Sequence, residues 1–596
     1  METAVLNQSV NSSAQYDRIQ LVGKILLAGF GLSLIINFFL GGLFDIGYPF
    51  DTFFFKSESK YLDFYYPYTI AGDPYKDVRG EVFSEMNPFS MPEIVSGQAW
   101  EINYLGPIYF PFAYWVVLPF GFFPLEVGLF LFWIITALVF ISMCYRHIRK
   151  EGGLFYTFIV AIFSYPLLFL LNRSNFEIVV FAFVYMFVFY YDKNKWVSSL
   201  FLAAAIAMKF LPFAYVLVQL SDRKYKQAIF SAGVAFLLNV VAYALYPGGL
   251  VNNIRAHLLN LQISSFFYIL DGRNIAFNSS LSAGIKYVLL VLRPALDLQA
   301  VGLRVENITI WASIILLVFV VVLFTIAKME YWEKVAIVTC VILLVPSSSS
   351  DYRLLLLYIP FFLWLNSSAK SWRDRMYGFL FGLLFIPKSY LHVPTYPEIS
   401  ISTFLNPLLM LIMIFAIAFG SLISQNQPEK DEVEYKAHTL KRKFVLLFFL
   451  LIVLVVFWPG MENKRKTISP NTVQELRLLA MRSERSADYS FAAGYYMQWT
   501  LLDTTTPENH LGLARVYLKM DRYWDSYQEY KKAALLSLKN SPSRLEAEVG
   551  LRMVSNDTIC YMIKMKQFGW SRLIQDEYND LFPDLPKTGS KKCSHN

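Results

Sequence analysis

The sequence predicts an all-α, polytopic membrane protein with a small water-soluble helical domain at its C-terminal end. Long apolar runs, a low content of charge and a 34-residue repeat near the C-terminus predict this class. Of the 596 residues, 56% are hydrophobic and only 16% are charged, whereas soluble domains carry about 25% charged residues. Uninterrupted apolar runs are solvated only by lipid or by one another, so we expect a membrane around them.

Apolar runs of two lengths occupy residues 22–458, the predicted transmembrane domain. The stretch 196–220 is broken by Lys209 and Pro212, which predicts two short helices that meet near the outer surface. If each run spans, the domain has about thirteen transmembrane helices. The lipid-length runs are 22–44, 125–145, 227–246, 307–327 and 402–424, and the shorter runs are 154–171, 175–191, 333–346, 352–366, 376–389 and 444–458.

Short loops rich in lysine and arginine predict the orientation. With these loops in the cytoplasm the segments alternate, provided that the short, proline-rich segment 107–123 is an interfacial helix on the outer face. The N-terminal tail 1–21 is then cytoplasmic, and the segments 45–124, 247–306 and 459–596 lie outside. The basic positions are Arg146, Arg149, Lys150, Lys193, Lys195, Arg223, Lys224, Lys226, Lys370, Arg373, Arg375, Lys441, Arg442 and Lys443.

The first 20 residues are mostly polar and the run 22–44 is too long for a signal-peptide core, so we expect no cleaved signal. This pattern fits an integral, multi-pass protein of the inner or plasma membrane in the cell envelope, and nothing pairs the basic clusters with nucleic-acid binding. Cys144 and Cys340 lie in apolar runs, as inert buried thiols do. Cys560 and Cys593 share the soluble tail and could form a disulfide in an oxidising compartment.

The C-terminal segment 459–596 has its own signature. Asp488-Tyr489 recurs as Arg522-Tyr523, Tyr496 as Tyr530 and Ala480 as Ala514, each after 34 residues. This is the period of the tetratricopeptide helix pair, in which small residues let two helices approach. The alternative is a generic helical cap with chance periodicity. Such repeats usually bind partners or polymers, so a protein partner is a possible ligand of the tail.

Acidic residues of the first outer segment are candidates for acid–base chemistry. Asp63 lies in the aromatic stretch Tyr61 to Tyr66, which we expect at the membrane surface. A carboxylate held against aromatic faces loses hydration and becomes a better proton acceptor, as a general base requires. The alternative is an interfacial aromatic belt with an incidental aspartate. Local composition does not decide between them.

Basic residues at the outer ends of helices are the second candidate set. Charges at this depth are costly and tend to be functional. If they converge from different helices, they form a clamp for a phosphate group. The alternative is snorkelling to lipid head groups. The residues are Arg173, Lys209, Arg353, Lys388 and, in the second outer segment, Arg273.

Several short motifs follow one another in a set order. They are Asp63 with Tyr66 and Gly72-Asp73-Pro74-Tyr75; Gly106 to Pro111 followed by Leu118-Pro119; Asn172 to Asn175; Ala203 to Pro212; Asn278 to Leu281; and Pro346 to Pro360. Together, over about residues 20–425, the chain resembles glycosyltransferase family 87. These are GT-C-fold membrane enzymes that include polyprenyl-phosphate-mannose-dependent mannosyltransferases. The tetratricopeptide-like tail is not part of the family core.

The resemblance implies an inverting transfer of a sugar from a polyprenyl-phosphate donor to a hydroxyl of a glycan, lipid or protein acceptor at the outer leaflet. Asp63 would be the base, and Arg173, Lys209, Arg353 and Lys388 would bind the donor phosphate. The sequence contains no cluster of metal ligands, so we expect no metal and no cofactor to be required. Acceptor-binding or supporting roles would fall to Asp73, Tyr66, Arg273, Asn278, Ser280, Asp351 and Tyr352.

One departure concerns the late motif, where the family often carries histidine and this chain has Asp351 and Tyr352. A role of the imidazole is therefore lost or taken by the carboxylate. The nearest rival function is a polysaccharide polymerase or oligosaccharide ligase, although these usually place their large loop late in the chain. A lipid-linked-sugar transporter would show repeated halves with matching broken helices, and only one clear break is present.

Overall fold

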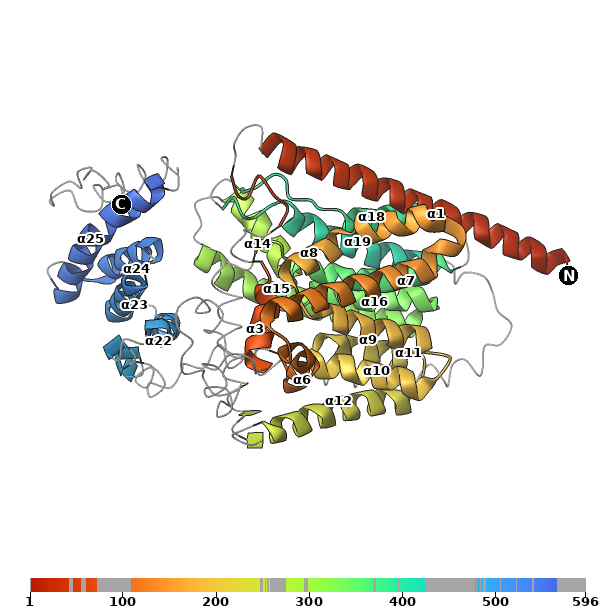
Figure 1. The fold of residues 1–596 in the computed structure, drawn as a ribbon, viewed down its shortest axis with the longest axis horizontal. Coiled ribbons are helices and arrows are strands. Elements are labelled where there is room, and N and C mark those ends of the chain that lie inside the picture. Colours follow the sequence, from red (N-terminus) through yellow and green to blue (C-terminus); the bar gives the residue numbers. More distant parts are fainter. Residues whose placement is uncertain are drawn as a thin grey trace. The chain divides into compact units, whose positions relative to one another are not determined.

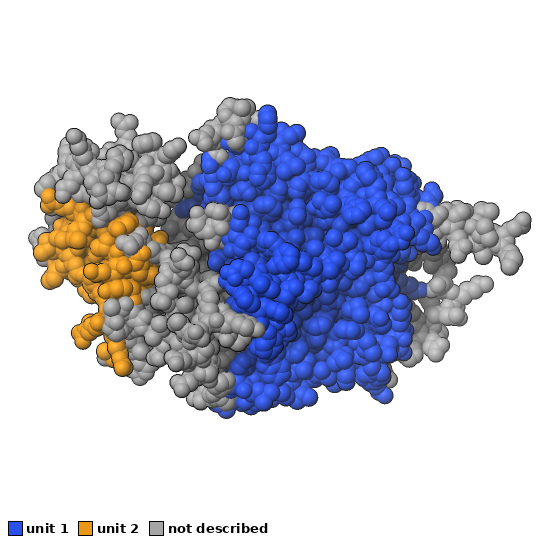
Figure 2. Space-filling view, in the orientation of Figure 1, with its two compact units in different colours: residues 1–91, 105–457 blue, residues 92–104, 458–596 orange. Residues whose placement is uncertain are grey.

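The computed structural model describes most of the predicted transmembrane domain and much of the tail. The chain divides into two compact units, residues 1–91 with 105–457 and residues 92–104 with 458–596, which Figure 2 colours separately. The described ranges are 2–41, 47–54, 60–71, 109–246, 250–251, 253–254, 257, 275–293, 298–367, 371–393, 396–423, 477–478, 480–482, 484–485, 489–503, 505–520, 523–538 and 541–564.

The regular elements of the described ranges are helical, which confirms the all-α class. Five helices are long and apolar enough to cross a membrane, and they coincide with the five lipid-length runs of the sequence. The last of the predicted runs, 444–458, lies outside the described residues, so the total number of spans stays a prediction. The five long helices are α1 (Glu2–Leu34), α7 (Leu125–Ile162), α12 (Tyr225–Leu245), α15 (Leu298–Ile326) and α19 (Ser402–Ile423).

Shorter apolar helices complete the first unit, and several of them run beside the long ones in Figure 1. The predicted break in 196–220 is confirmed, because α10 ends at Met208 and Lys209 is extended. Pro212 cannot continue the helix, since it lacks an N–H and its ring would clash with the carbonyl four residues earlier. These elements are α9 (Glu177–Tyr190), α10 (Lys195–Met208), η3 (Leu211–Tyr215), α11 (Val216–Ser221), α16 (Tyr331–Leu344), η4 (Asp351–Leu357), α17 (Tyr358–Leu365) and α18 (Ser371–Phe385).

The run 154–171 is not one helix, contrary to the sequence-based boundaries. The helix α7 is interrupted by a kink at Gly153, whose φ of 67° and ψ of −177° are not helical. Glycine is suited to this backbone because it has no Cβ. The run then divides at Ser164, which caps α8 (Tyr165–Arg173) by accepting a hydrogen bond from the Leu167 N–H. Polar capping residues inside an apolar run set these boundaries.

Three short elements lie in the predicted outer segments. The proline-rich helix α6 (Pro111–Gly121) is too short to span, in line with the interfacial helix expected there. Figure 1 shows α6 and α3 (Leu62–Ala71) beside each other at one end of the helix bundle. The helix α14 (Leu281–Leu292) was missed, because its 12 residues are fewer than a membrane-length window requires. A short π-helical turn, η1 (Ile35–Leu40), extends α1.

Glycines bring α1 and α18 into close contact. A Cβ placed on Gly382 would lie 2.9 Å from Cδ1 and Cγ2 of Ile25, and one on Gly378 would lie 2.9 Å from Cδ2 of Leu21. The two glycines are four residues apart on one face of α18. Small residues at this spacing let membrane helices pack closely where no hydrophobic effect drives their association. Packing of backbone against side chain therefore joins α1 to the rest of the bundle.

The second unit contains consecutive helices of the tail. The rings of Tyr496 and Tyr530 occupy the spaces beside Gly512 and Gly550, where no Cβ would fit. Ala480 and Ala514, the small residues of the predicted repeat, are both fully buried. Arg515 joins Glu484 and Glu546 through hydrogen bonds of 2.8 and 2.5 Å. The helices are α22 (Tyr489–Leu502), α23 (Pro507–Lys519), α24 (Tyr523–Leu536) and α25 (Pro542–Lys564).

Candidate active site

Asp63 lies in the first turn of α3, where the helix N-terminus favours a negative charge. Its carboxylate forms an ion pair with Arg173 and accepts a hydrogen bond of 2.7 Å from Nδ2 of Asn175. The Asp63 side chain is 18% exposed, so it is neither buried in the core nor free in solvent. The sequence suggested aromatic rings as its environment; the partners that the structure identifies are a guanidinium group and an amide.

The turn between α8 and α9 places both partners of Asp63. Ser174 adopts the left-handed conformation, with φ of 53°, and ends α8 directly after Arg173. The N–H of Asn175 bonds to the Leu170 carbonyl and that of Ser174 to the Leu171 carbonyl, which is the Schellman pattern of a helix end. Asn175 then accepts a 2.8 Å hydrogen bond from the N–H of Glu177. The polar turn therefore caps α9 and binds Asp63 with the same asparagine.

The same turn brings two further cations together through Glu177. Nζ of Lys209 lies 2.5 Å from Oε2 of Glu177, and Nε of Arg353 lies 3.9 Å from that oxygen. Lys209 is at the end of α10 and Arg353 is on η4, so three separate elements meet here. Arg173, Lys209 and Arg353 face the carboxylates of Asp63 and Glu177. One positive charge is therefore in excess in this group, which we call the charged cluster.

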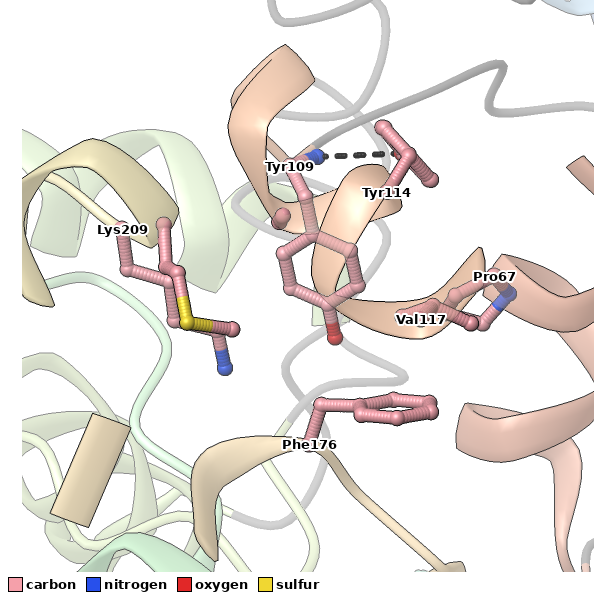
Figure 3. Close-up of a pocket in the computed structure, with 8 residues that line it drawn as sticks. Pro67, Tyr109, Tyr114, Val117, Phe176 and Lys209 are labelled. Atoms are coloured by element: carbon pink, nitrogen blue, oxygen red, sulfur yellow. Dashed lines mark hydrogen bonds between the residues drawn. The ribbon is translucent and has the colours of Figure 1, made fainter. Parts of the chain in front are cut away.

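Two tyrosines flank the charged cluster. The Tyr109 ring lies 4.9 Å from Nζ of Lys209, and Figure 3 shows this ring between Lys209 and Val117. Burial, together with the nearby Asp63 carboxylate, raises the pKa of the Tyr109 hydroxyl, so it remains a hydrogen-bond donor at neutral pH. Tyr352 is buried against Phe169 and interacts electrostatically with Asp63 and Arg353.

A small pocket adjoins the cluster on the α6 side. At about 10 Å³ it has room for a water-sized group only, so a sugar requires it to open. Apart from Lys209, Tyr109 and Tyr114, its walls are apolar. The lining residues, all drawn in Figure 3, are Pro67, Tyr109, Ala113, Tyr114, Val117, Phe176, Met208 and Lys209.

Asp351 belongs to a second, fully buried polar cluster. Its carboxylate accepts hydrogen bonds from Oγ of Ser279 at 2.5 Å, from the Tyr165 hydroxyl at 3.1 Å and from Nδ2 of Asn406 at 3.3 Å. Asn278 joins the two motifs, since its Oδ1 accepts from the N–H groups of Ser280 and Ser349. The adjacent residues Asp351 and Tyr352 thus face different surroundings. The Asp351 carboxylate stabilises the fold through its hydrogen bonds, and the Tyr352 phenol faces the charged cluster.

The structure brings together only part of the predicted site. Asp63, Arg173, Lys209, Arg353 and Tyr352 converge, whereas Lys388 does not join them. Its Nζ donates to the carbonyls of Leu383 and Ile386, and its charge acts on Asp351. Ser280 caps α14 and also donates to the Ser347 carbonyl. Asp73 and Arg273 lie outside the described residues, and of Tyr66 the structure describes the backbone alone.

Sequence reasoning missed Asn175, Glu177 and Tyr109. A signal for Glu177 was present, because an acid at the head of the apolar run 175–191 needs a counter-charge. Lys209 is such a counter-charge, but no spacing in the sequence links two residues that are 32 positions apart. Within the described ranges, no three histidine, cysteine, aspartate or glutamate side chains are arranged to hold a metal ion.

The arrangement unites a carboxylate that can accept a proton with cations that can bind an anionic leaving group. Comparison with known proteins agrees with this chemistry: residues 108–349 match the model of glycosyltransferase family 87. This confirms the resemblance over that range and supports a membrane glycosyltransferase. Arg173, Glu177 and Lys209 lie within the matched range, and Asp63 and Arg353 lie outside it. No curated protein and no solved structure matches the chain.

Proposed function

We propose that this membrane glycosyltransferase takes its sugar from a polyprenyl-phosphate donor and transfers it to an acceptor hydroxyl at the outer face of the membrane. The observation that carries the proposal is the charged cluster, in which Asp63 and three cations from separate elements converge. A lipid-linked donor places its phosphate near the membrane surface, where basic residues at helix ends can reach it. The family match supports glycosyltransferase activity as such, without specifying the donor or the acceptor.

In the proposed reaction Asp63 accepts the proton of the acceptor hydroxyl as its oxygen attacks the anomeric carbon of the sugar. The bond between that carbon and the phosphate oxygen breaks, and its electron pair leaves with the polyprenyl phosphate. Arg173, Lys209 and Arg353 stabilise the charge that develops on the leaving phosphate. The hydroxyl groups of Tyr109 and Tyr352 are available to donate hydrogen bonds to the oxygens of the leaving phosphate. The result is inversion at the anomeric carbon.

The tail enters the proposal as a binding module for the acceptor or for a protein partner. Its consecutive helices pack through Tyr496 and Tyr530 against glycines, as the tetratricopeptide-like interpretation requires. Deleting residues 470–596 should then change the choice of acceptor more than the hydrolysis of the donor by water. Equal losses in both reactions would argue against an acceptor-binding role.

The donor class can be tested with the purified full-length chain in lipid nanodiscs. Polyprenyl-phosphate sugars carrying mannose, glucose or a pentose are supplied in parallel with the corresponding nucleotide sugars, and transfer to a glycan, lipid or peptide acceptor is measured. We expect turnover with at least one polyprenyl-phosphate sugar and none with nucleotide sugars. Turnover with nucleotide sugars alone would refute the proposed donor.

A further inference from the structure

Glu177 is a nearly buried carboxylate, 3% exposed, that bridges two cations of the charged cluster. It lies in the first turn of α9, and its N–H is held by Asn175, which also binds Asp63. Both its backbone and its side chain are therefore positioned by the residues around the predicted base. Neither the sequence motifs nor the proposed reaction assigns Glu177 a role.

The cations that Glu177 holds retain the capacity to bind an anion. Nε of Arg353 is buried, and no hydrogen-bond partner for it exists among the described residues; it lies 3.9 Å from Glu177. Lys209 and Arg353 together carry two positive charges, and Glu177 cancels one of them. A single positive charge is thus left for an incoming group. The separate pair of Asp63 and Arg173 is neutral while Asp63 is deprotonated, as it is before the donor binds and again once Asp63 has released its proton to water, so it does not change this count in those states.

This charge matches the proposed donor better than the product. A sugar linked to polyprenyl phosphate is a phosphodiester with one negative charge. After transfer, the polyprenyl phosphate is a monoester with a charge of about −1.5 to −2 at pH 7. Without Glu177, the doubly positive pair would match the product and retain it.

We propose that Glu177 is a positioning residue that holds Lys209 and Arg353 in place and sets the net charge of the phosphate site to one, which favours release of the monoester product. This rests on the proposed function, because it requires a polyprenyl-phosphate donor. The carboxylate competes with the product phosphate for the two cations. It therefore opposes product inhibition more than it opposes donor binding.

The test varies the charge of the site in steps. In the wild type, Lys209, Arg353 and Glu177 have a net charge of +1. Glu177→Gln raises this net charge to +2, and Lys209→Met lowers it to zero. The double variant Glu177→Gln with Lys209→Met returns it to +1. The probe is farnesyl phosphate, a short polyprenyl monoester, measured by direct binding and by inhibition of transfer. We expect affinity to follow the charge, with Glu177→Gln tighter than the wild type by about tenfold or more.

The ratio of the farnesyl phosphate inhibition constant to the donor KM separates this role from a merely structural one. It should fall in Glu177→Gln and be higher in Lys209→Met than in the double variant. The control is Glu333→Gln, which changes another buried carboxylate, one in the capping box of α16. It should leave the ratio unchanged.

If Glu177→Gln does not fold, the other two variants still decide the question. Farnesyl phosphate that binds Lys209→Met as tightly as it binds the double variant would overturn the inference. Wild-type chain that neither binds farnesyl phosphate nor uses a polyprenyl-phosphate sugar would instead refute the proposed function. Wild-type activity without the expected order of affinities refutes the role of Glu177 alone.

Discussion

At the scale of single residues, the surroundings of two aspartates indicate that one acts in the reaction and the other stabilises the fold. Asp63 is partly exposed and binds a guanidinium group and an amide, whereas Asp351 is fully buried and accepts three side-chain hydrogen bonds. Both were plausible acids in the sequence. Only Asp63 lies with the cations of the charged cluster.

Asp63→Asn should lower kcat by a factor on the order of 10²–10⁴, the usual effect of removing a general base. The amide keeps the size of the side chain but does not accept the proton. Because the Asp63 side chain is partly exposed and asparagine keeps one hydrogen-bond acceptor, we expect a small change in thermal stability. Transfer assays and differential scanning fluorimetry measure the two effects. An active Asp63→Asn variant would show that another residue is the base.

Asp351→Asn should have the opposite profile, with a loss of stability that exceeds its direct effect on the reaction. The amide NH₂ replaces one of the two acceptor oxygens, either Oδ1, which accepts from Ser279 and Asn406, or Oδ2, which accepts from Tyr165. A buried donor left without its acceptor costs about 1–3 kcal/mol. Thermal unfolding in detergent measures this loss. Normal stability with no turnover would instead place Asp351 in the chemistry.

At the scale of elements, the contact of α1 with α18 depends on the absence of side chains at two glycines. Gly382→Val should lower the free energy of unfolding by about 1–3 kcal/mol, because the added methyl groups would overlap Ile25. Adding Ile25→Ala should recover part of the loss. The matched control is Gly233→Val on α12, where a Cβ would meet nothing within 4 Å. Equal losses in both glycine variants would show that helix propensity, rather than packing, is responsible.

The tail offers a second test at this scale. A fragment of residues 470–580 should fold alone and show a helical circular dichroism spectrum, since each helix pair packs on the next. Gly512→Ala and Gly550→Ala should each lower its melting temperature, because the rings of Tyr496 and Tyr530 occupy the space of the new Cβ. A fragment with little helix, or variants as stable as the parent, would contradict the repeat-like packing.

For the whole molecule, the basic loops predict that the N-terminus is inside and the tail outside. Lys193 and Leu538 are both exposed, and the exposed fraction of Leu538 is 82%, so cysteines there are accessible to a reagent on their own side. In a chain whose native cysteines are replaced by serine, an impermeant maleimide should label Leu538→Cys in intact cells. It should label Lys193→Cys after permeabilisation alone. The reverse pattern would place the charged cluster on the cytoplasmic face.

The sequence by itself determined the class of the protein and the positions of its five long apolar helices, because lipid-length runs are a local property of the chain. It also located the break at Lys209 and the turn at Arg173, since proline and capping residues act on their neighbours. Which charges meet was decided by the tertiary structure alone. Asp63 and Arg173 are 110 positions apart, and no local pattern relates them. Glu177 lies in an apolar run, and only folding places it between Lys209 and Arg353, because a buried cation requires a counter-charge from whichever helix packs beside it.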